Sequence, residues 1–74
     1  MLKIKKGVKM KFRNLVAEMV KNGITKSDIA TLIDKKQSTV TKKINGKISF
    51  YMSEVLKIRD MINPRLSIEY LFAE

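Results

Sequence analysis

The stretch TKSDIATLIDKKQSTVTKKING, residues 25–46, decides the fold, because it contains the signals for two short helices separated by three residues. Thr25 and Asp28 have the spacing of a capping box, in which the hydroxyl and the carboxylate each accept a hydrogen bond from a backbone N–H group at the start of a helix. This box predicts a helix over residues 26–33. The apolar side chains expected to face inward are Ile29, Ala30, Leu32 and Ile33.

A second helix is predicted over residues 37–44, where Asn45 and Gly46 provide a stop signal. Val40 and Ile44 are spaced i and i+4 and form the edge that we expect to be buried. The other face of this helix carries an amide, two hydroxyls and a basic group. In nucleic-acid-binding proteins such groups bind base edges and phosphates, although an ordinary solvated helix face has the same composition. These side chains are Gln37, Ser38, Thr41 and Lys42.

Amphipathic patterns predict three further helices. The first runs from residue 9 or 10 to residue 21, the second starts between residues 49 and 53 and ends at residue 62, and the third covers residues 68–72. The side chains expected to face the core are Phe12, Leu15, Val16, Met19, Val20, Phe50, Val55, Ile58, Met61, Ile62, Leu66 and Leu71. Tyr70 and Phe72 either close the core or contact a partner.

Together these segments predict an all-α protein, a compact domain of five helices over residues 10–74 that follows a basic N-terminal arm over residues 1–9. A chain of 74 residues leaves no room for a second core. Gly7 interrupts the arm, which is either a disordered tail or a segment that folds against phosphates or pairs as a short strand.

The composition limits the chemistry and indicates a polyanionic partner. Sixteen Lys and Arg residues against seven Asp and Glu residues give a formal net charge of +9. The basic residues gather in two blocks, residues 3–13 and residues 35–47. Without Cys or His, we expect no disulfide, no metal site, no cofactor and no imidazole-based catalysis. Because no carboxylate pair and no Gly-rich phosphate loop stands out either, we expect no enzyme. No small-molecule site is evident, and no apolar run approaches the ~18 residues that a membrane helix needs.

The order and spacing of five motifs resemble the lambda-repressor-like helix-turn-helix domains of phage Cro and CI repressors. The resemblance covers residues 10–72, and its motifs are IATLI at 29–33, QSTVT at 37–41, NGK at 45–47, VLKI at 55–58 and LSIEYLF at 66–72. It implies that the helix over 37–44 enters the major groove of a double-stranded DNA operator while the helix over 26–33 crosses the backbone.

By that resemblance, four side chains are expected to contact bases: Gln37, Ser38, Thr41 and Lys42. Four others are expected to contact phosphates: Lys26, Lys36, Asn45 and Lys47. Because operator half-sites lie about 34 Å apart, we expect a homodimer at least on DNA. The implied function is a cytoplasmic transcriptional repressor, of a bacterium or a phage-infected cell, that acts by occupying its operator. A protein-binding adaptor of the antitoxin or anti-repressor kind is the alternative.

Three positions depart from the family pattern. Asp34 stands where the family often has Gly, and it either adopts the left-handed conformation or caps the next helix with Gln37 completing the box. Lys35 stands where an apolar residue is common, and Lys26 replaces a frequent Gln at the start of its helix. The turn over residues 34–36 therefore decides where Gln37 points.

Overall fold

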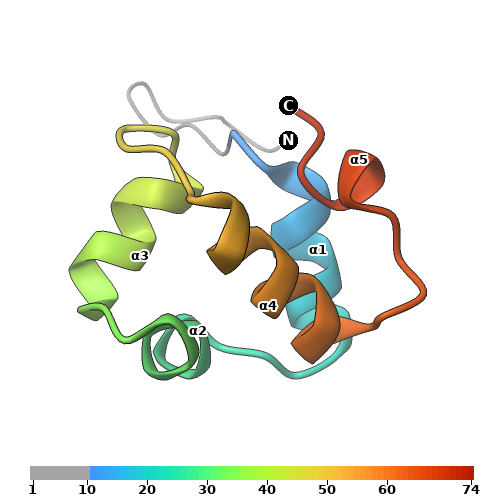
Figure 1. The fold of residues 1–74 in the computed structure, drawn as a ribbon, viewed down its shortest axis with the longest axis horizontal. Helices are drawn as coiled ribbons and strands as arrows, with labels where there is room; N and C mark the ends of the chain where they lie inside the picture. The colour runs from blue at the N-terminus through green and yellow to red at the C-terminus, as the bar shows by residue number, and fades with distance from the viewer. Residues whose placement is uncertain (1–10) are drawn as a thin grey trace, which may run out of the picture.

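The computed structural model describes residues 11–74, and within them it contains five helices and no strand (Figure 1). These bounds confirm the all-α prediction for this part of the chain. The helices are α1 (Arg13–Lys21), α2 (Lys26–Ile33), α3 (Gln37–Ile44), α4 (Met52–Ile62) and α5 (Ile68–Leu71).

The bounds predicted for α2 and α3 are confirmed, and α4 starts within the predicted range. Helix α5 ends one residue earlier than predicted. Helix α1 begins at Arg13, later than predicted, because Lys11 and Phe12 are not helical and no side chain caps the first turn. The arm predicted over residues 1–9 lies outside the described residues.

Helices α1, α2 and α3 end in the same way, with a left-handed residue followed by a backbone bond that returns five residues. The left-handed residues are Gly23, Asp34 and Gly46, with φ of 68°, 57° and 84°. This Schellman arrangement satisfies carbonyls that the helix leaves unpaired. The returning N–H groups donate from Ile24 to Met19 at 2.8 Å, from Lys35 to Ala30 at 3.0 Å and from Lys47 to Lys42 at 2.8 Å.

Asp34 therefore closes α2, and the alternative in which it caps α3 is wrong. The N-cap of α3 is Lys36, which makes no side-chain capping bond. At the start of α2 the predicted capping box is confirmed, with Thr25 Oγ1 accepting from the Asp28 N–H at 3.1 Å and Asp28 accepting from the Thr25 N–H at 2.8 Å. The Thr25 N–H, and with it the Thr25 hydroxyl, stabilise the charged carboxylate and hold the pKa of the Asp28 carboxyl below its usual value.

The core contains most of the apolar side chains predicted for it. Phe12, Phe50 and Phe72 close one end, with ring centroids 5.4–5.6 Å apart, so Phe72 belongs to the core. Val20 was predicted to face inward and is 77% exposed, because it lies about 100° around α1 from the buried Met19. The fully buried residues are Leu15, Ile29, Val40, Ile44, Ile58 and Leu71.

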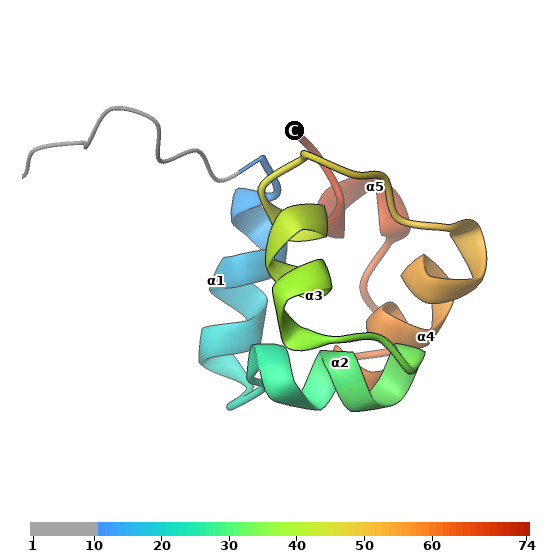
Figure 2. The same cartoon turned by 90° about the vertical axis from the view of Figure 1, so that its left-hand side faces the viewer.

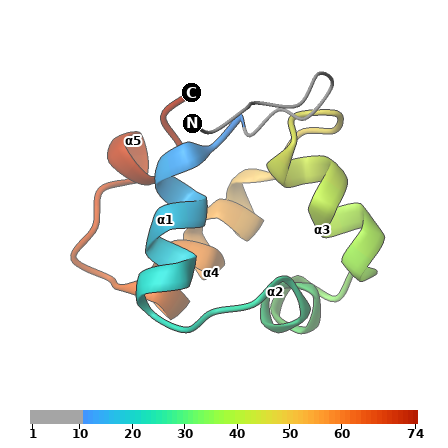
Figure 3. The ribbon, with the colours of Figure 1, turned by 180° about the vertical axis from the view of Figure 1, so that it is seen from behind.

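The helices surround this core from several directions. Seen from the side of α3, α2 lies below it, α1 and α4 lie to its two sides, and α5 lies behind (Figure 2). Seen from behind the view of Figure 1, α1 lies in front of α4 (Figure 3). No helix among residues 11–74 has the length and apolar character needed to cross a membrane.

Candidate nucleic-acid interface

Helix α3 is anchored by its inner edge and leaves its outer face uncovered. Val40 and Ile44, the two residues predicted to be buried, are 0% and 2% exposed. In Figure 2 no element of the described chain lies in front of α3. The short turn at Asp34 ties α3 to α2, so the position of the outer face is set by the core below it.

The four predicted base contacts lie together on this outer face. Gln37, Ser38 and Lys42 are exposed, and Thr41 is half-buried. Their positions i, i+1, i+4 and i+5 cover one side of the helix. The Thr41 hydroxyl donates to the Gln37 carbonyl at 3.2 Å, which leaves its oxygen free to accept a hydrogen bond but commits its proton to the helix.

Three of the four predicted phosphate contacts bracket α3. Lys36 precedes the helix, and Asn45 and Lys47 follow it. The two lysines are exposed, and Asn45 is half-buried. An eight-residue helix is about 12 Å long, so positive charge stands at both ends of the polar face. The fourth, Lys26, is exposed at the start of α2.

The N-terminal ends of α2 and α3 differ in what they offer to an anion. The first turn of α2 contains Asp28, whose carboxylate and Thr25 partner cap the helix. The first turn of α3 has no acidic residue and no side-chain cap, and Lys35 and Lys36 precede it. Uncapped N–H groups and the positive end of the helix dipole attract anions. The start of α3 is therefore the more favourable of the two for a phosphate.

Lys43 is the one lysine of the second basic block that does not face solvent. Its side chain is 5% exposed, and its Nζ donates to the Ser49 carbonyl at 2.9 Å and to Glu54 Oε1 at 3.0 Å. As one of the five lysines of that block, Lys43 counts in the sequence as charge available to a polyanion. The spacing of Lys43 from Val40 and Ile44, i+3 and i−1, could have shown that it shares their face.

Glu54 is the acidic partner in this buried pair. Burial disfavours the charged carboxylate, but the Tyr51 N–H and the Lys43 ammonium outweigh it and hold the pKa of Glu54 below its usual value. The Tyr51 N–H donates to Glu54 Oε1 at 3.0 Å. Four lysines around α3 then remain exposed: Lys35, Lys36, Lys42 and Lys47.

Lys11, from the first basic block, reaches the C-terminal end of α3. Its aliphatic stem lies against Gly46, where an added Cβ would stand 2.5 Å from Lys11 Cδ. Its Nζ lies 3.4 Å from the Glu74 carboxylate. Helical spacing could not reveal this contact, because Lys11 precedes α1 and meets the α3 end through the fold.

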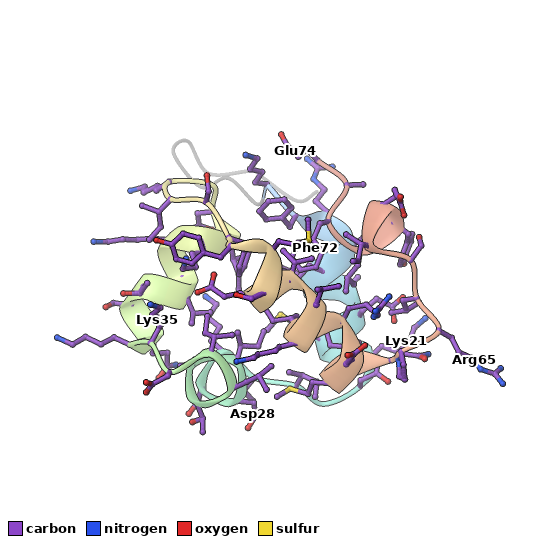
Figure 4. The ribbon with its side chains drawn as sticks, viewed as in Figure 1. Lys21, Asp28, Lys35, Arg65, Phe72 and Glu74 are labelled. Carbon is purple, nitrogen blue, oxygen red and sulfur yellow. The ribbon has the colours of Figure 1, made fainter. Side chains whose placement is uncertain are left out.

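Basic side chains also occur far from α3. Lys21 and Arg65 lie on the side of the protein opposite Lys35, and Arg65 extends away from the body of the protein (Figure 4). Positive charge alone therefore does not distinguish one face. What distinguishes the outer side of α3 is the combination of exposed lysines with an exposed amide and hydroxyl.

Residues 11–74 contain no group of three or more acidic side chains placed to hold a metal ion. A wide, mostly apolar depression between α2 and α4 is lined by Ile24, Asp28, Thr31, Leu32 and Met61. It has a single carboxylate, already used in the capping box.

Comparisons of the chain with protein-family models, with curated proteins and with solved structures found no match.

Proposed function

We propose that residues 11–74 are a lambda-repressor-like DNA-binding domain in which α2 and α3 form the helix-turn-helix. In this proposal α3 enters the major groove, and Gln37, Ser38, Thr41 and Lys42 contact bases. Lys26, Lys36, Asn45 and Lys47 contact phosphates. The observation that carries the proposal is the outer face of α3, where polar side chains lie between lysines at both ends of the helix.

The proposed role is a sequence-specific transcriptional repressor that occupies an operator and involves no catalysis. Lysine–phosphate contacts supply most of the affinity by releasing counterions, so binding weakens steeply as salt rises. A homodimer on DNA places two copies of α3 about 34 Å apart, on successive turns of the same face of the duplex.

Substitutions on α3 and beside it test this division of labour. Gln37→Ala should relax discrimination at one base pair per half-site by about 1–3 kcal/mol, because a good amide–adenine contact has that value. Lys47→Ala should instead weaken binding to operator and random DNA alike and reduce the salt slope by about 1. Fluorescence anisotropy over a series of salt concentrations measures both effects.

Arg65→Ala is the matched control, because it removes one positive charge on the side opposite Lys35. It should leave the salt slope at its wild-type value. The proposal fails if Gln37→Ala and Lys47→Ala behave identically on operator and random DNA, or if Arg65→Ala weakens binding as much as Lys47→Ala. Complete absence of salt-sensitive binding to DNA would instead favour a protein-binding adaptor.

A further inference from the structure

The connection between α3 and α4, residues 45–51, carries two of the proposed phosphate contacts and has no regular secondary structure. A segment of this kind would normally pay an ordering cost when it binds. Here its first residues are fixed by the Schellman bonds at the end of α3 and by the contact of Gly46 with the stem of Lys11. Its later residues, Ser49 and Tyr51, are held by a buried ion pair.

Lys43 and Glu54 hold those later residues through the backbone. The Lys43 ammonium binds the Ser49 carbonyl at 2.9 Å, and the Glu54 carboxylate accepts from the Tyr51 N–H at 3.0 Å. The two charges meet at 3.0 Å, and their side chains are 5% and 7% exposed. The same ammonium lies 4.8 Å from the centroid of the Tyr51 ring. Two alternate residues of the connection are thus tied to one ion pair.

Stability alone does not explain a pair in this position. Burying both charges costs desolvation energy, and apolar residues of similar volume often hold two helices together equally well. An apolar pair between α3 and α4 could not, however, bind the Ser49 carbonyl or the Tyr51 N–H. The distinctive effect of Lys43 and Glu54 is therefore to fix the backbone of the connection.

We propose that Lys43 and Glu54 are positioning residues for DNA binding, which hold the far end of the connection at Ser49 and Tyr51 so that the segment between this end and the α3 stop presents Lys47 to the DNA backbone. Neither side chain contacts DNA in this proposal, because both are buried. The connection is ordered before binding, so the Lys47 contact forms without the ordering cost. This inference rests on the proposed function.

A double-mutant cycle on DNA affinity tests the coupling between the pair and Lys47. The variant Lys43→Met/Glu54→Leu, which we call the pairless variant, removes both charges together. It should bind DNA roughly three- to tenfold more weakly than wild type at fixed salt, the range expected for losing the prior order of a few groups. In a Lys47→Ala background the same change should have almost no further effect, because the contact that it positions is already absent.

Lys36→Ala gives the matched control, since Lys36 stands at the other end of α3 and lies outside the connection. The factors by which Lys36→Ala and the pairless change each lower DNA affinity should multiply when the two are combined. If the pairless variant is unfolded by circular dichroism, Lys43→Gln/Glu54→Gln enters the same cycle, because it also leaves the net charge unchanged and the amide that replaces the Glu54 carboxylate can still accept from the Tyr51 N–H. A smaller loss with the same dependence on Lys47 is expected.

The inference is overturned if a folded pairless variant binds DNA as tightly as wild type. The inference is also overturned if the pairless change lowers DNA affinity by the same factor in the Lys47→Ala background as in the Lys36→Ala background. The pair would then act on the fold as a whole. If wild-type protein shows no salt-dependent DNA binding, the proposed function itself fails and this inference falls with it. The wild-type titration therefore separates the two failures.

Discussion

Replacing Glu54 by leucine should destabilise the fold far more than the loss of a surface ion pair. The Lys43 ammonium would keep one acceptor, the Ser49 carbonyl at 2.9 Å, in a side chain that is 5% exposed. Removing one partner of a buried pair costs about 3–5 kcal/mol, because the remaining charge is left uncompensated. The total free energy of unfolding of a 74-residue domain is about 4–11 kcal/mol. The variant should therefore lose a large part of its stability.

The partner substitution should cost less, and the two losses should not add. Lys43→Met leaves the Glu54 carboxylate bonded to the Tyr51 N–H in the first turn of α4, so we expect a loss of about 2 kcal/mol. The pairless variant carries no buried charge and should lie within about 1–2 kcal/mol of wild type. Independent effects would instead sum to at least about 5 kcal/mol.

Urea unfolding at pH 7, followed by circular dichroism, measures all four proteins. Asp60→Asn serves as the control, since Asp60 pairs with Arg59 at 2.8 Å and is 61% exposed, and its loss should stay within about 1 kcal/mol. The reasoning is refuted if Glu54→Leu costs no more than Asp60→Asn, or if the pairless variant loses the sum of the two single losses.

Three further predictions concern stability. The folded pKa of Glu54 lies below its ordinary value of 4.5, so the stability that the Glu54 carboxylate contributes is present above pH 4.5 and is lost as the pH falls through the folded pKa. The urea midpoint of wild type should decrease over this pH range, and the pairless variant should lack the contribution of Glu54 to that decrease. Gly46→Ala should lower the urea midpoint more than Gly23→Ala, because only a Cβ at Gly46 would meet Lys11. Both positions are left-handed, which costs any other residue about 1 kcal/mol in either case, so equal losses would contradict this. Phe72→Ala should cost about 3 kcal/mol by the same assay, since it opens the cluster of three rings, whereas an unchanged midpoint would place Phe72 outside the core.

The parts of the fold that local chemistry decides could be predicted from the sequence. The capping box at Thr25 and Asp28 and the stop at Gly46 each involve residues within one turn, so the bounds of α2 and α3 followed from spacing alone. The start of α1 could not be predicted in this way, because no capping side chain marks it. Asp34 had two local solutions, and the Schellman bond from Lys35 to Ala30 distinguishes them.

The contacts that join distant segments were not predictable from local pattern. Lys43 and Glu54 lie eleven residues apart on different helices, and each charged residue taken alone is expected to be exposed at the surface. The three-ring cluster likewise draws Phe12, Phe50 and Phe72 from different parts of the chain. Pairing of this kind depends on how the helices pack, which periodicity does not specify.

The exposure of the candidate site, in contrast, followed from helical periodicity. Once Val40 and Ile44 are assigned to the core, the geometry of a helix sends Gln37, Ser38 and Lys42 outward. What these side chains bind depends on a partner molecule, which neither the sequence nor the fold of a single chain contains.

Selection of bound sites from random double-stranded DNA shows directly whether α3 recognises a DNA sequence. We expect an enriched palindromic sequence whose two half-sites are centred one helical turn, about 10 base pairs, apart. We also expect Gln37→Ala to weaken the base preference at one position of each half-site. If the wild-type protein enriches no sequence, the proposed recognition of DNA by α3 is wrong.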